Sequence, residues 1–428
     1  MNFSVQKNDF LNETLYVGKH KSGLTVYILK KENFNKYYSV ISTKYGSNDI
    51  SFKHKDDKDY ITVPDGIAHF LEHKLFEQPD GSNAFDKFSL YGANANAFTS
   101  FNNTAYLFQS TSHFYENLDH LLNYVYLPYF TKENVEKEQG IIGQEIRMYD
   151  DDPDWQVMFN MLKGMYVEHP VRRDIAGTVE SISMIDKDLL YDCYNIFYHP
   201  ENMVLFMAGD IDVSKIPDIL DKNVPVKDYK YDTISKDTDE PLNINEKEII
   251  KELDVSIPMF SMGYKDNIKN IYGKELLKIN FLTSIIVKLF IGESSSLYNR
   301  MYKEGIINES FYDDITMNRD YSFIQFAGES KNWEKVRENI LNCAKTFEIN
   351  ENDFNRMKKN MYGKYIKSFN SIETIGNGFC YNYFLGIDLF DFLDIYDEIT
   401  VEDAKKRFDQ LFDENMFVTS VVVPKKNN

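Results

Sequence analysis

The stretch His69-Phe70-Leu71-Glu72-His73 carries residue types that could bind a metal ion and activate water. On a helix, residues four apart lie on one face, so His69 and His73 can direct two imidazoles at one point. Zinc accepts such nitrogens at about 2.0–2.1 Å and lowers the pKa of bound water from about 15.7 to about 7. Glu72 lies beside the pair and could accept a proton from that water. The pattern therefore indicates metal-dependent hydrolysis.

Two surface histidines on an amphipathic helix are the alternative interpretation. The chain contains only eight histidines, and for that composition a chance match to the pattern is on the order of one in a hundred. Because a candidate for a third ligand also occurs, the pattern favours a metal site.

A zinc site needs at least one more protein ligand, and the segment 131–150 offers two acidic candidates. Thr131 can cap a helix there, and Glu138 and Glu145 are seven residues apart, which places both on one helix face. One of them could bind the metal, while the other could hold a ligand histidine by its free N–H. The cysteines are isolated in the sequence and are interpreted as core residues: Cys193, Cys343 and Cys380.

These motifs resemble the pitrilysin/insulinase-like zinc metallopeptidases (inverzincins), in particular the processing-peptidase-like subfamily and the bacterial YmfH-like group. That family combines His-x-x-Glu-His with a glutamate ligand roughly seventy-odd residues later, and Glu145 follows His73 by 72 residues. The resemblance implies that His69, His73 and Glu145 bind one Zn²⁺, with Glu72 as general base and Glu138 as a supporting residue. It also implies an α+β fold of two related α/β halves, each a mostly antiparallel sheet packed with helices, which form a clam-like cavity.

A second stretch resembles the substrate-binding strand of the same family. Residues 92–99 (GANANAFT) match the pattern Gly-x-x-x-Asn-Ala-x-Thr, and Thr104-Ala105-Tyr106 follows. In relatives this is an edge strand that pairs with the substrate backbone by β-augmentation. The resemblance therefore implies substrate binding at Asn96, Ala97 and Phe98. An ordinary hairpin with a turn at Asn102-Asn103 is the alternative.

The length of 428 residues predicts more than one domain. Residues 1–225 are expected to form a zinc-bearing metallopeptidase half, and residues 247–428 a related half without a metal site. Residues 226–246 are polar and charged without periodicity, which is typical of a linker. One short echo indicates duplication, because Glu201-Asn202-Met203 and Glu414-Asn415-Met416 each lead into an apolar strand near the end of a half.

The chain is acidic, with 67 Asp and Glu against 48 Lys and Arg and a net charge of −19. This balance argues against nucleic-acid binding, and it suits the steering of basic or neutral peptides to an acidic cleft. Neither a secretory signal nor an apolar stretch of membrane-spanning length is visible. Because three unpatterned cysteines fit a reducing compartment, we expect a cytoplasmic protein without a membrane span.

The second half departs from the family at the positions where self-sufficient relatives carry an arginine and a tyrosine that touch substrate. Tyr302 and Asn308 stand there instead, after Ser294-Ser295-Ser296-Leu297. The resemblance thus predicts a zinc endopeptidase that hydrolyses extended peptides in an enclosed cavity. It would act as a homodimer, or as the metal-bearing subunit of a heterodimer whose related partner carries the Arg/Tyr pair. The alternatives are a non-catalytic scaffold subunit of this family and a structural zinc protein, which would require a fourth ligand.

Overall fold

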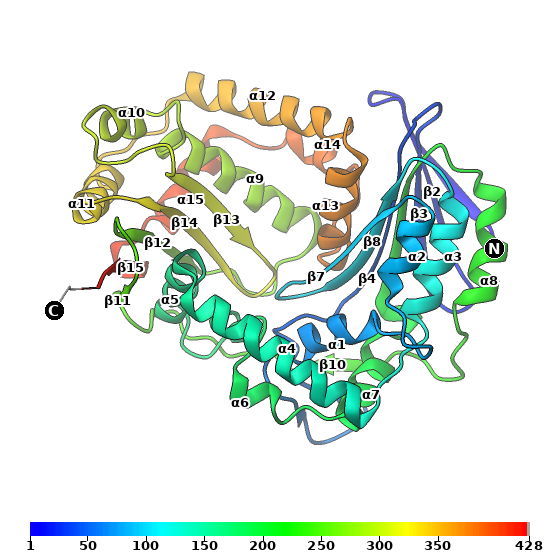
Figure 1. The fold of residues 1–428 in the computed structure, drawn as a ribbon. Helices are drawn as coiled ribbons and strands as arrows, with labels where there is room; N and C mark the ends of the chain where they lie inside the picture. The colour runs from blue at the N-terminus through cyan, green and yellow to red at the C-terminus, as the bar shows by residue number, and fades with distance from the viewer. Residues whose placement is uncertain (426–428) are drawn as a thin grey trace. The chain divides into compact units, whose positions relative to one another are not determined.

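The computed structural model describes residues 1–425, which form two compact units (Figure 1). Unit 1 contains Met1–Ile146, Asp174–Asp237 and Lys367–Phe384. Unit 2 contains Arg147–Arg173, Thr238–Ile366 and the segment that begins at Leu385. Each unit is a mostly antiparallel sheet packed with helices, so the predicted α+β class is confirmed.

A seven-stranded sheet in the order β1-β2-β3-β9-β4-β8-β7 forms the centre of unit 1. Neighbouring strands are antiparallel except for the parallel pair β3–β9. The central strand β9 is buried along its whole length and reads as a continuous apolar run, as expected for a strand covered on both faces. The strands are β1 (Phe3–Asn8), β2 (Glu13–Lys19), β3 (Thr25–Lys30), β4 (Tyr37–Thr43), β7 (Asn94–Thr99), β8 (Thr104–Ser110) and β9 (Met203–Gly209).

Helices and a small second sheet complete unit 1. The small sheet has the order β10-β5-β6 and consists of β5 (Ser51–His54), β6 (Ile61–Thr62) and β10 (Thr233–Ser235). The helices that begin in unit 1 are α1 (Ile67–Leu75), α2 (Ala84–Leu90), α3 (Phe114–Val125), α4 (Lys132–Asp151), α6 (Val179–Ile182), α7 (Lys187–Phe197), α8 (Ile216–Asn223) and α13 (Ile372–Phe384).

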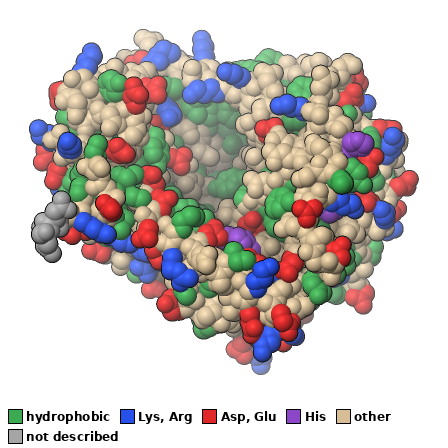
Figure 2. Space-filling view, in the orientation of Figure 1, with side chains coloured by type: hydrophobic (Ala, Val, Ile, Leu, Met, Phe, Trp, Pro, Cys, Tyr) green, Lys and Arg blue, Asp and Glu red, His purple; other side chains and the backbone are tan. Residues whose placement is uncertain are grey.

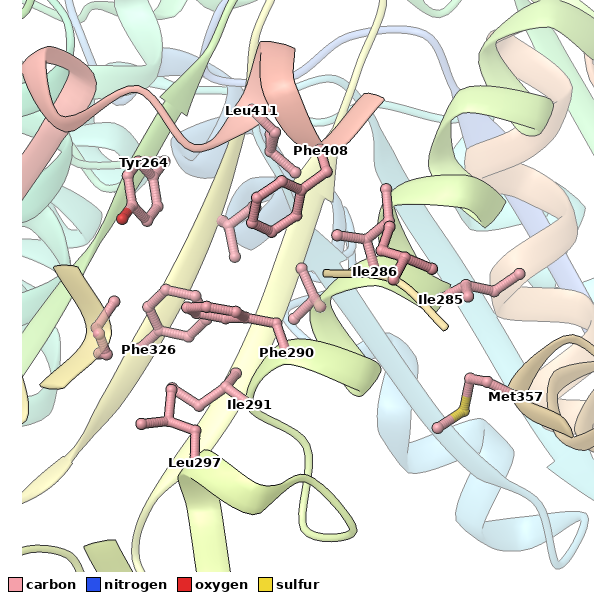
Figure 3. Packing of buried hydrophobic residues seen from close by; sticks show 14 of the residues in the cluster. Tyr264, Ile285, Ile286, Phe290, Ile291, Leu297, Phe326, Met357, Phe408 and Leu411 are labelled. Carbon is pink, nitrogen blue, oxygen red and sulfur yellow. The ribbon is translucent and has the colours of Figure 1, made fainter. Parts of the chain in front are cut away.

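Unit 2 is built on a five-stranded sheet in the order β11-β15-β12-β14-β13. Its strands are β11 (Glu248–Leu253), β12 (Met259–Asp266), β13 (Tyr312–Met317), β14 (Ser322–Glu329) and β15 (Phe417–Pro424). Figure 3 shows the core of this unit, where Phe290, Phe326 and Phe408 pack together from a helix, a strand and a second helix. The helices are α5 (Pro153–Met165), α9 (Gly273–Phe290), α10 (Ser296–Lys303), α11 (Trp333–Ala344), α12 (Glu351–Ser368), α14 (Asp391–Tyr396) and α15 (Val401–Leu411).

The two sheets share one topology, which supports the expected relation between the halves. In each, the last strand pairs in parallel with an early strand, β9 with β3 and β15 with β11. The next strands follow in the same spatial order, β4-β8-β7 and β12-β14-β13. The repeated Glu-Asn-Met lies at matching places, because a short 3₁₀ turn at Pro200–Asn202 precedes β9 and one at Glu414–Met416 precedes β15.

The unit boundaries differ from the division expected at residues 225 and 247, because each unit includes a helix from the other half of the chain. Helix α5 packs on β12 and β15, where Val157 joins a cluster with Leu253 and Val422. Helix α13 packs on β4 and β9, and the Tyr38 hydroxyl donates a hydrogen bond to Asn377 Oδ1. Which sheet a helix packs against depends on the match between their apolar surfaces in the folded protein. The order of residues along the chain therefore does not predict that α5 belongs to unit 2 and α13 to unit 1.

The expected linker also differs from a free connection. The chain does pass from unit 1 to unit 2 at Asp237, within residues 226–246. However, β10 in this segment pairs with β5, and Glu240 is only 5% exposed. Its carboxylate accepts hydrogen bonds of 2.7–2.9 Å from the backbone N–H groups of Val167, Glu168 and His169. It also accepts one from the side chain of Lys265. The segment is therefore held to unit 1 through β10 and to unit 2 through Glu240.

The described surface mixes both signs of charge. Figure 2 shows acidic and basic side chains interspersed over the face in view, so the acidic surplus on this face does not form one block. None of the helices within residues 1–425 has the length and apolar character needed to cross a membrane.

Candidate active site

Helix α1 carries three of the predicted site residues and is buried along almost its whole length. It begins directly after Gly66, whose φ is 91°. A Cβ at this position would lie 2.4 Å from the carbonyl oxygen of Ala176, so only glycine permits this sharp start. His69 and Glu72 are each 9% exposed, which means that packing around α1 determines where their side chains point.

The structure brings His69, His73 and Glu145 together, with one potential ligand atom from each within 4.8 Å of the others. His69 Nε2 lies 3.7 Å from one Glu145 oxygen, and His73 Nε2 lies 3.5 Å from the other. Two ligands of a tetrahedral zinc, each about 2.0–2.1 Å from the ion, are themselves about 3.3 Å apart. The three side chains therefore fit a divalent ion, and two imidazoles with one carboxylate are a donor set that zinc accepts.

The sequence left open which glutamate would face the metal, and the structure separates the two. Glu145 faces the Nε2 atoms of both histidines, whereas Glu138 Oε1 lies 3.1 Å from Nδ1 of His73. A hydrogen bond from Nδ1–H to Glu138 leaves Nε2 of His73 free to bind a metal. The geometry therefore suits Glu145 as a metal ligand and Glu138 as a group that orients His73.

The two histidines have opposite electrostatic environments. Burial lowers the pKa of His69 to about 3, and the neighbouring His73 adds to this effect. Burial also opposes protonation of His73, but the hydrogen bond with Glu138 and the charges of Glu72 and Glu145 outweigh it and raise the pKa of His73. His69 is therefore neutral near pH 7, which is the protonation state that a metal ligand needs.

The pKa values of Glu138 and Glu72 are also shifted in opposite directions. Burial alone would raise the pKa of Glu138, but the hydrogen bond and charge of His73 and the charge of Lys74 hold it below its usual value. Burial raises the pKa of Glu72, and a hydrogen bond from Thr99 only partly offsets this rise. A carboxylate with a raised pKa is a better proton acceptor than an ordinary one, as a general base requires.

Two residues with a part in the site were not singled out from the sequence. The hydroxyl of Thr99 donates a hydrogen bond of 2.8 Å to Glu72 Oε2. Lys74, next to His73, is completely buried and lies 3.8 Å from Glu138. Thr99 is the last residue of the Asn-Ala-x-Thr pattern, which was the available signal. A lysine within a helix of apolar residues was the signal for Lys74.

Strand β7 lies beside this cluster and has a free edge. It pairs with β8, and within residues 1–425 it has no second strand partner. A cavity of about 490 Å³ is lined by Glu72 and His73 together with Asn96 and Ala97 of β7. Phe98 does not line this cavity, so of the three expected substrate-binding residues only Asn96 and Ala97 lie in its wall.

The positions that depart from the family pattern lie in unit 2. Tyr302 on α10 is 44% exposed and stacks on Tyr298 with ring centroids 5.9 Å apart. Asn308 accepts hydrogen bonds from Ser310 within a turn. Arg300, two residues before Tyr302 on α10, donates a hydrogen bond to Asn339 Oδ1. Each of these side chains has a local role within unit 2.

Comparison with protein families finds two consecutive matches. Residues 57–179 match the family model described as Insulinase (Peptidase family M16), and residues 185–361 match the one described as Peptidase M16 inactive domain. The first match includes the His-x-x-Glu-His motif together with Glu138 and Glu145 of helix α4.

Individual relatives agree with this assignment. The chain is 43% identical to "Uncharacterized zinc protease YmfH" of Bacillus subtilis, over 97% of this chain and 98% of the relative. A solved structure described as an M16-like peptidase from Alicyclobacillus acidocaldarius superposes with a TM-score of 0.91 at 30% identity, covering 99% of both chains. A protease from Helicobacter pylori shares the fold, with a TM-score of 0.81 at 20% identity over 96% of this chain and 99% of that one. The chain therefore belongs to the insulinase, or M16, family of peptidases.

Proposed function

We propose that this protein is a zinc-dependent endopeptidase that hydrolyses extended peptides. The observation that carries the proposal is the position of Glu145, whose two oxygens face Nε2 of His69 and Nε2 of His73, while Glu72 lies on the same helix as both histidines. The raised pKa of Glu72 supports a role in proton transfer. Relatives of this chain carry the name zinc protease.

His69, His73 and Glu145 would hold the zinc ion, which when bound supplies Lewis-acid chemistry and lowers the pKa of water. Glu72 would accept the proton of the attacking water at a carboxylate oxygen. It would then donate this proton to the nitrogen of the leaving amine, which completes cleavage of the peptide bond. Thr99 would hold Glu72 in place for these transfers through the hydrogen bond from its hydroxyl to Oε2.

Substrate would bind along the free edge of β7. Main-chain hydrogen bonds to this edge would hold a peptide in an extended conformation with little demand on its side chains. Asn96 and Ala97 belong to β7 and line the same cavity as Glu72, so a peptide on this strand would pass beside the proposed base. Phe98 remains a predicted contact through its backbone, and the enclosure of substrate between the two halves remains a prediction.

A partner subunit is part of the proposal. The chain has the metal-binding motif but has Tyr302 and Asn308 at the positions of the substrate-contacting pair. Donors aimed at the developing oxyanion lower the barrier by several kcal/mol, roughly 3–4 for one donor. We therefore infer either a homodimer that cleaves slowly or a heterodimer with a related subunit that supplies an arginine and a tyrosine.

Cleavage of a quenched peptide library by the zinc-loaded protein tests the proposal, with Glu72→Gln as the inactive control. Cleavage that disappears in the variant would establish a self-sufficient peptidase. If the wild-type protein binds one zinc and cleaves only when a related subunit is added, the heterodimer is supported. If it neither binds zinc nor cleaves with any related subunit, the non-catalytic scaffold is the correct alternative.

The affinity for zinc is expected to decrease as the pH is lowered, because protons compete with the metal for His73. Since the pKa of His73 is raised, this decrease should begin above the ordinary imidazole pKa of 6.5. Glu138→Gln removes the carboxylate that raises this pKa, so the range should move to lower pH. Zinc titrations between about pH 5 and 8 with a competing chelator would measure both curves. An unchanged range in the variant would contradict the link between Glu138 and His73.

Thr99→Val should lower kcat by about 10- to 100-fold, because it removes a hydrogen bond to a charged group that is worth about 1.5–3 kcal/mol. Zinc affinity should stay unchanged, since Thr99 contacts Glu72 and not the three ligands. Thr99→Ser keeps the hydroxyl and serves as the matched variant. Equal kinetics for the Val and Ser variants would show that the hydrogen bond does not position Glu72.

A further inference from the structure

Lys74 is the next residue after His73 and is completely buried, with 0% of its surface exposed. Burial of an ammonium group is strongly unfavourable unless charged and polar partners surround it. Lys74 has three such partners, two of them on α4. It pairs with Glu77 just after α1, donates to the carbonyl oxygen of Asn134 at 3.3 Å, and lies 3.8 Å from Glu138 Oε2.

These contacts join the two helices that supply the proposed ligands. Asn134 and Glu138 are one turn apart on α4, and Glu145 follows two turns later on the same helix. His69 and His73 belong to α1, and Figure 1 shows α1 and α4 side by side. A shift of α4 along its axis would move Glu138 and Glu145 together, away from Nδ1 and Nε2 of His73.

Lys74 also offsets repulsion among carboxylates. Glu72, Glu77 and Glu138 line one cavity together with His73, and Glu145 faces both histidines, so four carboxylates share this region and repel one another. The ammonium group of Lys74 pairs with Glu77 and lies 3.8 Å from Oε2 of Glu138, whereas His73 contacts the other oxygen, Oε1.

We propose that Lys74 is a positioning residue that fixes α4 against α1, and thereby sets the affinity of the site for zinc. It acts through Glu138 on His73 and through the placement of α4 on Glu145, without touching a ligand or substrate itself. The inference rests on the proposed function only in assuming that His69, His73 and Glu145 bind the metal.

Lys74→Met removes the charge and keeps the length of the side chain. We expect zinc to bind about tenfold to 100-fold more weakly, which is the usual effect of removing a group that supports a metal ligand. Competition with a chromophoric chelator would measure the dissociation constant. In the cobalt-loaded protein, the visible absorption bands should shift, since they report ligand geometry.

Lys265→Met is the matched control. Lys265 is also buried, with 6% of its surface exposed, and is paired with the buried Glu240 in unit 2. Both substitutions should lower the melting temperature, but only Lys74→Met should weaken zinc binding. Equal zinc affinity in Lys74→Met and the wild type would overturn the inference, as would an equal loss in both variants.

If Lys74→Met does not fold, the double variant Lys74→Met/Glu77→Gln removes one carboxylate that has lost its partner and should restore folding. Its zinc affinity should remain weakened, because the support of Glu138 is still absent; wild-type affinity would overturn the inference. Failure of the wild-type protein itself to bind zinc would instead contradict the proposed function, so the two outcomes are distinguishable.

Discussion

Glu72→Gln is expected to lower kcat for peptide hydrolysis by about 10²- to 10⁴-fold, the usual contribution of a positioned acid or base. The amide has nearly the shape of the carboxylate, so it can still accept the hydrogen bond from Thr99, but it cannot take a proton from water. Because His69, His73 and Glu145 are unchanged, the variant should still bind one zinc per chain. Initial rates on a quenched peptide and metal analysis of the same sample would measure both properties.

Glu136→Gln is the matched control for this change. Glu136 lies on α4 with 61% of its side chain exposed, in a surface pair with Lys132. The same chemical substitution there should leave both rate and zinc content unchanged. If Glu72→Gln retains the wild-type rate, Glu72 is not the base, and if it loses zinc, Glu72 is a ligand or a support of the ligands.

His73→Ala is expected to abolish zinc binding, and hydrolysis with it. The substitution removes one of three ligands, and it also leaves the buried Glu138 without the imidazole that it contacts. The loss of affinity should exceed the roughly 10- to 100-fold that follows when only a supporting group is removed. Dialysis against a weak chelator, followed by metal analysis, would separate the two cases.

His54→Ala is the control for the second substitution, because His54 is 48% exposed and pairs with Asp232 on the surface. It should retain zinc and activity. Comparable zinc loss in His73→Ala and Glu72→Gln would overturn the separate roles given to these two residues. Zinc retained by His73→Ala would show that the metal binds elsewhere.

The sequence alone was sufficient for the arrangement of groups along each helix. The spacing of His69, Glu72 and His73 places them on one short helix, and the seven-residue spacing of Glu138 and Glu145 places both on one face of another. These relations depend only on helix periodicity, which is local. The α+β class followed from the family resemblance, and the matching strand order of the two sheets agrees with it.

The tertiary structure decided how these pieces meet. It showed that Glu145 rather than Glu138 faces both Nε2 atoms, that Thr99 contacts Glu72 across 27 residues, and that Lys74 joins α1 to α4. It also placed α5 and α13 in units that a division of the chain into consecutive halves does not predict. Contacts between segments that are distant in the sequence depend on which helix and sheet surfaces pack together. A single sequence indicates which surfaces are apolar, but it does not show which of them pack against one another.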